Sequence, residues 1–259
     1  MSYKITALAD TKAEYAFDAD TPEGREAVRE FRPHYNQDPD FIDAMPSRLD
    51  YETWLPFAAK TYQISPNIED YALVVSPICP ADLPNRNGVA FPLAELKKFP
   101  PPPANRMVYK CWSGCPMHLE HDNEDCTKAY GVVLDASLHK VTGYGGGKLW
   151  KVMGLFAIDK TKYPDVAQQV ISKQINTYSM GAMADYFTCS FCGSQMDRFD
   201  HCQHLNPGSN IDFYETSNWD GERHLVFRNA HSLSPIEVSI VKDPAWAPAL
   251  SDHFLPAVA

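Results

Sequence analysis

Apolar residues gather in short runs along the second part of the chain, and the runs are separated by residues that favour turns. The runs are rich in β-branched and aromatic residues, which suit a buried strand. The runs that predict strands are residues 71–77, 107–109, 129–134, 152–158, 178–187, 224–227 and 236–241.

Few segments show the spacing of an amphipathic helix. Residues 164–175 place Val166, Val170 and Ile171 near one face, and a proline at the first position suits the first turn. Short helices are also expected over residues 25–31 and near residues 91–96. Many strands with few helices predict a small mixed barrel or an α+β fold.

The first part of the chain has a different texture. Residues 1–65 are polar and irregular, and residues 18–50 mix Pro, Asp, Glu and Arg with few periodic apolar positions. This pattern predicts an N-terminal extension over residues 1–65 with little core of its own. A folded domain over residues 66–259 is expected to follow it.

Charge and hydropathy narrow the function classes. The chain has 259 residues, with 23 Lys and Arg against 33 Asp and Glu and a net charge of −10. An acidic balance argues against a general binder of nucleic acid or of an anionic membrane, because both need a basic surface. The apolar stretch over residues 149–158 is too short to span a bilayer, and residues 1–6 lack the apolar segment of a signal peptide. A soluble protein made in a reducing compartment is expected.

The spacing of the cysteines indicates a metal site. Seven cysteines, an odd number, argue against a disulfide framework. Cys189 and Cys192 form a Cys-x2-Cys pair whose thiolates can face one tetrahedral ion, and Cys202 and His204 follow closely. Three sulfurs and one imidazole are typical of structural zinc. The set predicts a small zinc-binding insert over about residues 186–216.

Alternatives for the cysteines stay open. His201 is the other candidate imidazole for the zinc site. Cys111, Cys115 and Cys126 have no obvious fourth ligand, so packing or loop positions are favoured over a second metal. The Cys-x2-Cys pair could also serve a thiol enzyme, but it is better used to hold metal. The chain has no His-Glu-x-x-His motif, and four protein ligands leave no open position, so a structural role is expected.

Three separate segments stand out: a polar loop over residues 119–123, residues 178–181 just after a helix, and residues 236–245. A serine hydroxyl becomes a good nucleophile only when a neighbouring imidazole takes its proton. The imidazole in turn needs a group that fixes its tautomer and stabilises the imidazolium. Each element alone is a weak signal, since a loop histidine is usually just solvated.

Together these elements form an ordered series of short motifs. The series is Asn85-Arg-Asn-Gly88, Phe91-Pro, Glu95-Leu96, Glu120-His121, Gly131 with Asp135, Ser179-Met-Gly181, Glu237-Val-Ser-Ile-Val and Pro244-Ala245. In order and spacing it resembles the prohead (capsid-maturation) serine proteases of tailed bacteriophages, which are related to herpesvirus assemblin. The resemblance covers about residues 68–250, and the cysteine insert also looks like one found in some of these phage proteins.

The resemblance implies a fold and a set of site residues. The implied fold is a small, largely antiparallel β-barrel surrounded by helices, like that of the herpesvirus proteases. The family's nucleophile maps onto Ser179 and its general base onto His121, while His118 competes for the second role. The third group is acidic or a second histidine, and Glu237 is the candidate. Alternatives for that third group are Asp122, Asp135 and Asp243. Gly181 is expected to let the backbone come close to a substrate carbonyl.

The resemblance also implies a function. It is that of a serine endopeptidase that cleaves scaffold and capsid proteins, and itself, during phage prohead maturation. The expected partners are the phage scaffold and major capsid proteins and further copies of this chain, with no nucleic acid and no membrane. The expected location is the host cytoplasm, inside the assembling prohead. The alternative is a catalytically inactive, zinc-stabilised capsid-assembly protein of the same fold. A zinc-binding module unrelated to proteolysis would explain the cysteines but not the other motifs.

Overall fold

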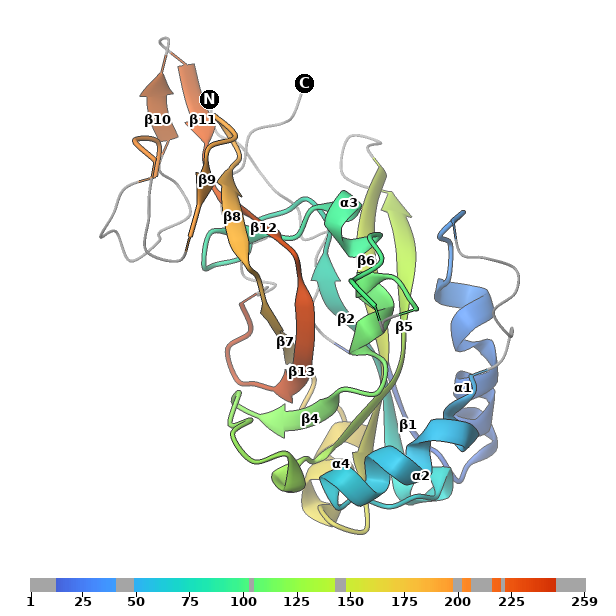
Figure 1. Ribbon diagram of the computed structural model, residues 1–259. Coiled ribbons are helices and arrows are strands. Elements are labelled where there is room, and N and C mark those ends of the chain that lie inside the picture. The colour runs from blue at the N-terminus through green and yellow to red at the C-terminus, as the bar shows by residue number, and fades with distance from the viewer. Residues whose placement is uncertain are drawn as a thin grey trace.

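A computed structural model of the chain describes residues 13–40, 49–102, 105–142, 148–197, 202–205, 216–219 and 222–245. Its main element is a seven-stranded sheet with the order β1-β2-β6-β5-β4-β13-β7 (Figure 1). Neighbouring strands are antiparallel except for β4 and β13, which are parallel. The strands are β1 (Tyr15–Asp18), β2 (Tyr71–Pro80), β4 (Pro116–Leu119), β5 (Gly131–Thr142), β6 (Lys148–Asp159), β7 (Tyr178–Met183) and β13 (Ser234–Ile240).

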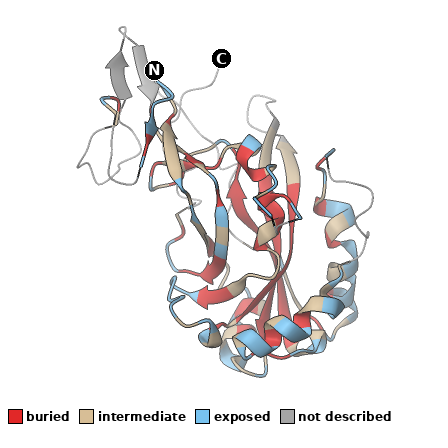
Figure 2. Cartoon of the chain, in the orientation of Figure 1, coloured by how far each residue is buried: buried red, intermediate tan, exposed pale blue. Residues whose placement is uncertain are grey.

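The central strands are apolar throughout because both of their faces are buried. On β2, Tyr71 and Leu73 belong to one hydrophobic cluster, while Ala72 and Val74 belong to another on the opposite face. Figure 2 shows the middle of the sheet as its most buried part. The helices that pack on the two faces are α1 (Pro22–Tyr35), α2 (Tyr51–Tyr62), α3 (Leu93–Leu96) and α4 (Pro164–Ile171).

The residues expected to form an N-terminal extension take part in this core. Strand β1 pairs with β2, and Phe31 of α1 and Leu55 of α2 are buried in the same cluster as Tyr71 and Leu155. The boundary expected at residue 65 therefore does not separate two cores. The polar texture of this region has a simple cause: each of its helices buries only one stripe and exposes the rest to solvent.

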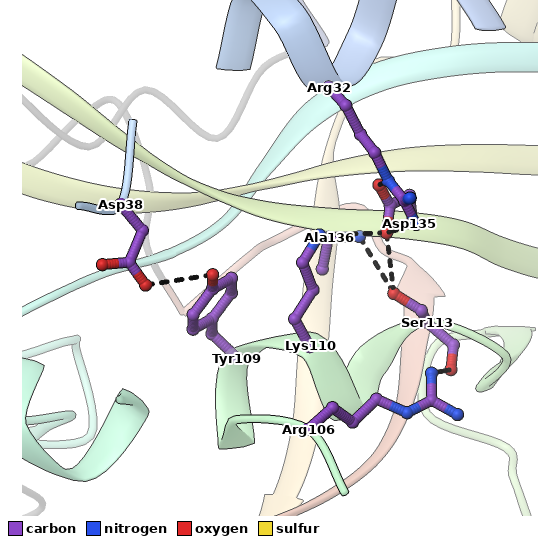
Figure 3. Close-up of polar contacts among 8 residues, drawn as sticks. All are labelled: Arg32, Asp38, Arg106, Tyr109, Lys110, Ser113, Asp135 and Ala136. Atoms are coloured by element: carbon purple, nitrogen blue, oxygen red, sulfur yellow. Dashed lines mark hydrogen bonds and ion pairs between the residues drawn. The ribbon is translucent and has the colours of Figure 1, made fainter. Parts of the chain in front are cut away.

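A buried ionic network joins α1 to the sheet (Figure 3). The Asp135 carboxylate on β5 is 1% exposed and lies 2.7 Å from Nε of Arg32 in α1. Nζ of Lys110 and Oγ of Ser113 each lie 3.2 Å from the other carboxylate oxygen. Burial lowers the pKa of Lys110, and the charge of Asp135 opposes that effect. The network anchors the N-terminal helix through the interior of the fold.

A smaller sheet has the order β3-β12-β8-β9, and a separate hairpin joins β10 to β11. Strands β8 and β9 and the hairpin lie beyond one end of the large sheet (Figure 1). Strand β8 begins shortly after β7, so the two sheets follow each other directly along the chain. The strands are β3 (Val89–Ala90), β8 (Tyr186–Cys189), β9 (Gln195–Met196), β10 (Thr216–Trp219), β11 (Glu222–Leu225) and β12 (Arg228–His231).

Two sequence predictions about local structure need correction. The strand expected at residues 107–109 is a 3-10 helix, η2 (Val108–Trp112). Tyr109 and Trp112, three residues apart, share one face of this helix and are fully buried. The helix expected over residues 164–175 ends at Ile171, because Lys173 takes a left-handed conformation with φ of 59°. The other short 3-10 helices are η1 (Ile68–Asp70) and η3 (Cys126–Lys128).

The expected α+β class with mostly antiparallel sheets is confirmed, but a closed barrel is not seen. In the described part of the chain, β1 and β7 are the two ends of the large sheet and are not paired with each other. The ends do approach, since the backbone N–H of Ala13 donates to the carbonyl of Asn176 at 2.9 Å. The sheet is therefore strongly curled but open. Among the described residues, no helix has the length and apolar character needed to cross a membrane.

Candidate active site and metal centre

The candidate site is built on the pairing of β7 with β13. Ser179 lies opposite Ser239, and Gly181 lies opposite Glu237. Because side chains alternate along a strand, these four positions share one face of the pair. The intervening residues on the other face, such as Val238, belong to the apolar core. The alternation of side chains thus places the polar residues on one face of the β7–β13 pair and the apolar core residues on the other.

The third segment of the site is the turn after β4, which carries His121. Glu120 and His121 both have left-handed backbones, with φ of 50° and 61°. Such conformations cost about 1–3 kcal/mol each for residues other than glycine, so the surroundings must hold them. The backbone N–H of Glu120 donates to the carbonyl of Ile240 at 2.8 Å, and that of His121 donates to Oγ of Ser239 at 3.2 Å. The turn is therefore fastened to β13.

His121 and Glu237 form a direct pair. Nδ1 of His121 lies 2.7 Å from Oε1 of Glu237, whose side chain is fully buried. The hydrogen bond to Glu237 raises the pKa of His121 above its ordinary value, and burial acts in the opposite direction. When the neutral ring donates from Nδ1, Nε2 is left as a proton acceptor. The pair thus has the arrangement of a general base with its orienting carboxylate.

Gly181 makes room for this carboxylate. A Cβ atom at Gly181 would lie 2.5 Å from Oε1 of Glu237, closer than real Cβ contacts allow. The sequence predicted that this glycine serves a close approach of substrate to the backbone. In the structure, the group that comes close is the side chain of Glu237.

Ser179 and His121 open into one cavity. Ser179 is 5% exposed, and its hydroxyl makes no hydrogen bond to any residue in the described part of the chain. The cavity has a volume of about 570 Å³, which lies in the range of ligand-binding clefts. Its walls include Ser179, His121, Phe91, Phe187, Arg86 and Asp243.

The acidic alternatives to Glu237 lie elsewhere. Asp135 is held by Arg32 and Lys110 in the buried network described above. Asp243 forms an ion pair with Arg86 at the wall of the cavity. Asp122 is exposed, and no hydrogen bond or ion pair joins its carboxylate to His121 among the described residues. Of the candidates that the sequence left open, Glu237 is the one that contacts the imidazole.

His118 occupies a different environment from His121. Its side chain is 1% exposed, and neither ring nitrogen has a hydrogen-bond partner among the described residues. Burial lowers the pKa of His118, so the ring is held neutral. It does not line the cavity that contains Ser179. His118 is therefore a buried packing residue, whereas His121 reaches the space where a substrate would sit.

The expected metal ligands also come together. The ligand atoms of Cys189, Cys192, Cys202 and His204 all lie within 4.8 Å of one another, so this cluster could hold a metal ion. His201, the alternative imidazole, lies outside the described residues.

Local structure explains why the first two thiols face the same point. Gly193 has a left-handed backbone with φ of 71°, and its N–H donates to the Cys189 carbonyl at 2.9 Å, which closes a tight turn around Cys192. The Ser194 hydroxyl lies 3.2 Å from the Cys192 sulfur. Hydrogen bonds from Ser194 lower the pKa of Cys192 to about 6, whereas burial raises that of Cys189. A thiolate is the form that binds metal.

Cys111 and Cys115, which lie outside this cluster, behave as packing residues. The sulfur of Cys115 lies 3.3 Å from the carbonyl of Cys111, and that of Cys111 lies 3.5 Å from the carbonyl of Met107. Burial raises the pKa of Cys115 to about 12, which opposes the thiolate that a metal needs. Within the described residues, neither thiol belongs to a group that could hold an ion.

Ser239 contacts both partners of the histidine–carboxylate pair, although it was not among the site residues predicted from the sequence. The available signal was its spacing of two residues from Glu237 in a strand, which places both side chains on one face. The site therefore contains Ser179, His121, Glu237 and Ser239 on three segments that are distant in sequence. Comparison of the chain with family models, with curated proteins and with solved structures found no match.

Proposed function

We propose that the protein is a serine endopeptidase in which Ser179 is the nucleophile, His121 the general base and Glu237 the residue that orients the base. The observation that carries this proposal is the 2.7 Å pair of His121 and Glu237, whose histidine shares a cavity with Ser179. A buried carboxylate, an exposed imidazole and a nearby serine are the components of acyl transfer to a hydroxyl.

The proposed reaction has two halves. Oγ of Ser179 attacks the peptide carbonyl while Nε2 of His121 takes the hydroxyl proton. The C–N bond then breaks, and His121 gives that proton to the leaving amine. Water, activated by the same imidazole, hydrolyses the acyl-enzyme and restores Ser179. Glu237 remains ionised and stabilises the imidazolium that forms in each half.

The biological setting of this activity is also proposed, and it rests on the order of sequence motifs. This part of the proposal includes a herpesvirus-protease-like fold and phage scaffold and capsid proteins as substrates. It also includes self-processing and action inside the assembling prohead. The curled, mostly antiparallel sheet is compatible with that fold. In this reading the metal is zinc, bound by Cys189, Cys192, Cys202 and His204. Three sulfurs and an imidazole suit zinc and leave no open position, so the metal would stabilise and not catalyse.

One observation favours the second candidate, an inactive capsid-assembly protein of the same fold. Ser179 and His121 are not hydrogen-bonded to each other in the described structure. Such bonds are often long in enzymes without substrate and tighten only in the complex, so an active enzyme is compatible with the same geometry. A direct test of the reactivity of Ser179 separates the two candidates.

The test uses an alkyl fluorophosphonate, which needs no knowledge of the peptide substrate. Oγ of an activated serine forms a bond to phosphorus, fluoride leaves, and the imidazole takes the serine proton. We expect one label per chain on Ser179 by peptide mass mapping, and none in Ser179→Ala. Casein digestion or self-cleavage should be lost in the same variant. A wild-type chain that stays unlabelled and does not cleave itself or casein would support the inactive alternative.

The chain offers a matched control for this test. Nδ1 of His231 lies 2.9 Å from Oε1 of Glu95, and its Nε2 lies 2.8 Å from the Thr188 hydroxyl. This carboxylate–imidazole–hydroxyl series does not line the cavity. We expect Thr188→Ala and His231→Ala to keep wild-type labelling of Ser179, whereas His121→Ala abolishes it. Equal effects of the two histidine substitutions would mean that labelling reports on folding alone.

A further inference from the structure

Ser239 touches both partners of the proposed base. It is fully buried near the end of β13, opposite Ser179 on β7 and opposite His118 on β4. Its hydroxyl lies 2.5 Å from Oε2 of Glu237 and 3.2 Å from the backbone nitrogen of His121. A hydroxyl has one proton to donate, so it donates to the carboxylate and accepts from the backbone N–H.

These two contacts act on different parts of the site. The Oε1 atom of Glu237 is bonded to the imidazole, so the contact of Ser239 with Oε2 fixes the second oxygen and prevents rotation of the carboxylate. The contact with the His121 N–H holds the left-handed turn from which the imidazole projects. One hydroxyl thus sets the direction of the carboxylate and the place of the ring.

Other residues support this turn but do not replace Ser239. The N–H of Glu120 is bonded to the Ile240 carbonyl, and the N–H of Lys242 donates to Oε1 of Glu120 at 2.9 Å. Both contacts hold the neighbouring residue and not His121 itself. Without the Ser239 hydroxyl, the His121 N–H and Oε2 of Glu237 would lose the hydrogen-bond partner that the structure shows for each.

We propose that Ser239 is a positioning residue for the reaction at Ser179, one that holds His121 and Glu237 in their working arrangement through a single hydroxyl. The inference rests on the proposed function and deepens it. Ser239 does not line the cavity that contains Ser179 and His121. Its effect is expected on the chemical step and not on binding.

The experiment compares Ser239→Ala with the wild-type chain by the rate of fluorophosphonate labelling at several probe concentrations. We expect the maximal labelling rate to fall about 10- to 100-fold, since a small misplacement of a catalytic group has effects of that size. The apparent affinity for the probe should stay within about twofold of the wild-type value. The pH midpoint of the rate should also move down, toward that of a free imidazole, because the loosened carboxylate no longer favours the charged ring.

Two further variants keep the test informative if Ser239→Ala folds poorly. Ser239→Thr keeps the hydroxyl and should restore labelling to within a few-fold of wild type. Ser239→Cys is nearly isosteric but donates weakly, so it should keep the melting temperature and lose labelling rate. Ser137→Ala is the matched control, since Ser137 is equally buried and its hydroxyl has no partner among the described residues.

The outcomes distinguish the role of Ser239 from the proposed function on which that role rests. Wild-type labelling at Ser179 with an unchanged rate and pH midpoint in a folded Ser239→Ala or Ser239→Cys variant would overturn the role of Ser239 alone. A wild-type chain that takes no label at Ser179 and cleaves nothing would overturn the proposed function and the role of Ser239 with it.

Discussion

His121 and Glu237 come from segments more than a hundred residues apart, and their side chains meet at 2.7 Å. Glu237 is fully buried, whereas the His121 side chain is 42% exposed. The pair therefore joins a carboxyl group inside the protein to a titratable ring that borders the cavity. Because of this combination, both the reactivity of Ser179 and the stability of the fold should depend on the protonation of His121.

The first prediction concerns the reactivity of Ser179 as pH changes. Only the neutral imidazole can accept a proton, and Glu237 raises the pKa of His121 above the ordinary value of 6.5. Labelling of Ser179 should therefore rise with pH and reach its midpoint above pH 6.5. In Glu237→Gln the midpoint should move down and the maximal rate should fall by at least about tenfold, because the imidazolium loses its partner.

Glu95→Gln is the control for that substitution, since Glu95 makes a similar contact with His231 away from the cavity. It should leave both the rate and the midpoint of labelling unchanged. A midpoint that is the same in Glu237→Gln and in wild type would show that the two side chains are not paired in solution.

The second prediction concerns stability as pH changes. The pKa of His121 is raised in the folded state, so the folded protein binds a proton more tightly than the unfolded chain does. The contribution is fully present below the unfolded pKa of about 6.5 and is lost as pH rises through the higher folded value. In urea unfolding, His121→Ala should therefore lose more stability at pH 5.5 than at pH 9.

The partner substitution tests whether Glu237 causes this dependence. In a Glu237→Gln background, His121→Ala should change the free energy of unfolding by a similar amount at both pH values. If the pH dependence persists in that background, another charge must be responsible for the raised pKa.

The third prediction concerns Gly181. A methyl group at this position would overlap Oε1 of Glu237, so Gly181→Ala must displace the carboxylate or the strand. We expect a loss of about 1–3 kcal/mol in unfolding free energy from overpacking. We also expect a fall in the labelling rate of Ser179 as large as that of Glu237→Gln. Met183→Ala, at the exposed end of the same strand, should change neither quantity, and a fully active Gly181→Ala would contradict the assigned role of the glycine.

The strands of the core could be predicted from sequence because their signal is local. Residues 71–75 and 152–158 contain no polar side chain, and the structure buries both faces of β2 and β6 there. The curl of the sheet depends on contacts between distant segments, and so does the packing of residues 13–40 and 49–62 against it. One such contact, that of Arg32 with Asp135, spans 103 positions and has no periodic signal in either segment.

The same distinction between local and non-local signals applies to the residues of the candidate site. The metal ligands could be predicted because a turn places Cys189 and Cys192 together whatever the rest of the chain does. The acidic partner of His121 could not be chosen from the sequence. The candidates were Glu237, Asp122, Asp135 and Asp243, and the choice depends on which strand lies beside the His121 turn. The pairing of β4 with β13 decides it, and this pairing is parallel and non-local.

The fourth prediction concerns the buried network around Asp135. Asp135→Asn would leave the buried charges of Arg32 and Lys110 without their carboxylate, which costs about 3–5 kcal/mol in comparable cases. Urea unfolding should report this loss, whereas folded protein at low temperature should still label Ser179 because Asp135 does not line the cavity. Arg29→Ala removes an exposed ion pair from the same helix and should leave the stability close to that of the wild-type chain, because solvent screens such a pair. Loss of labelling in well-folded Asp135→Asn would bring Asp135 back as a candidate for the third catalytic group.

The fifth prediction concerns the metal centre. Protein purified with a reductant should contain about one zinc per chain by elemental analysis, since the cluster offers one tetrahedral set of ligands. Cys189→Ser should lose the metal and lower the melting temperature, because binding of the ion contributes directly to folding of the segment that holds it. Ser179 labelling should persist in this variant at low temperature if the metal only stabilises the fold.

Cys126→Ser is the matched control for the metal. Cys126 is exposed, and its sulfur lies 3.9 Å from the carbonyl of Thr61, away from the cluster. This variant should keep both the zinc content and the melting temperature. Zinc-free protein from a reducing preparation would contradict the metal assignment. Immediate loss of Ser179 labelling on chelation, before any loss of fold, would contradict a metal that only stabilises the fold.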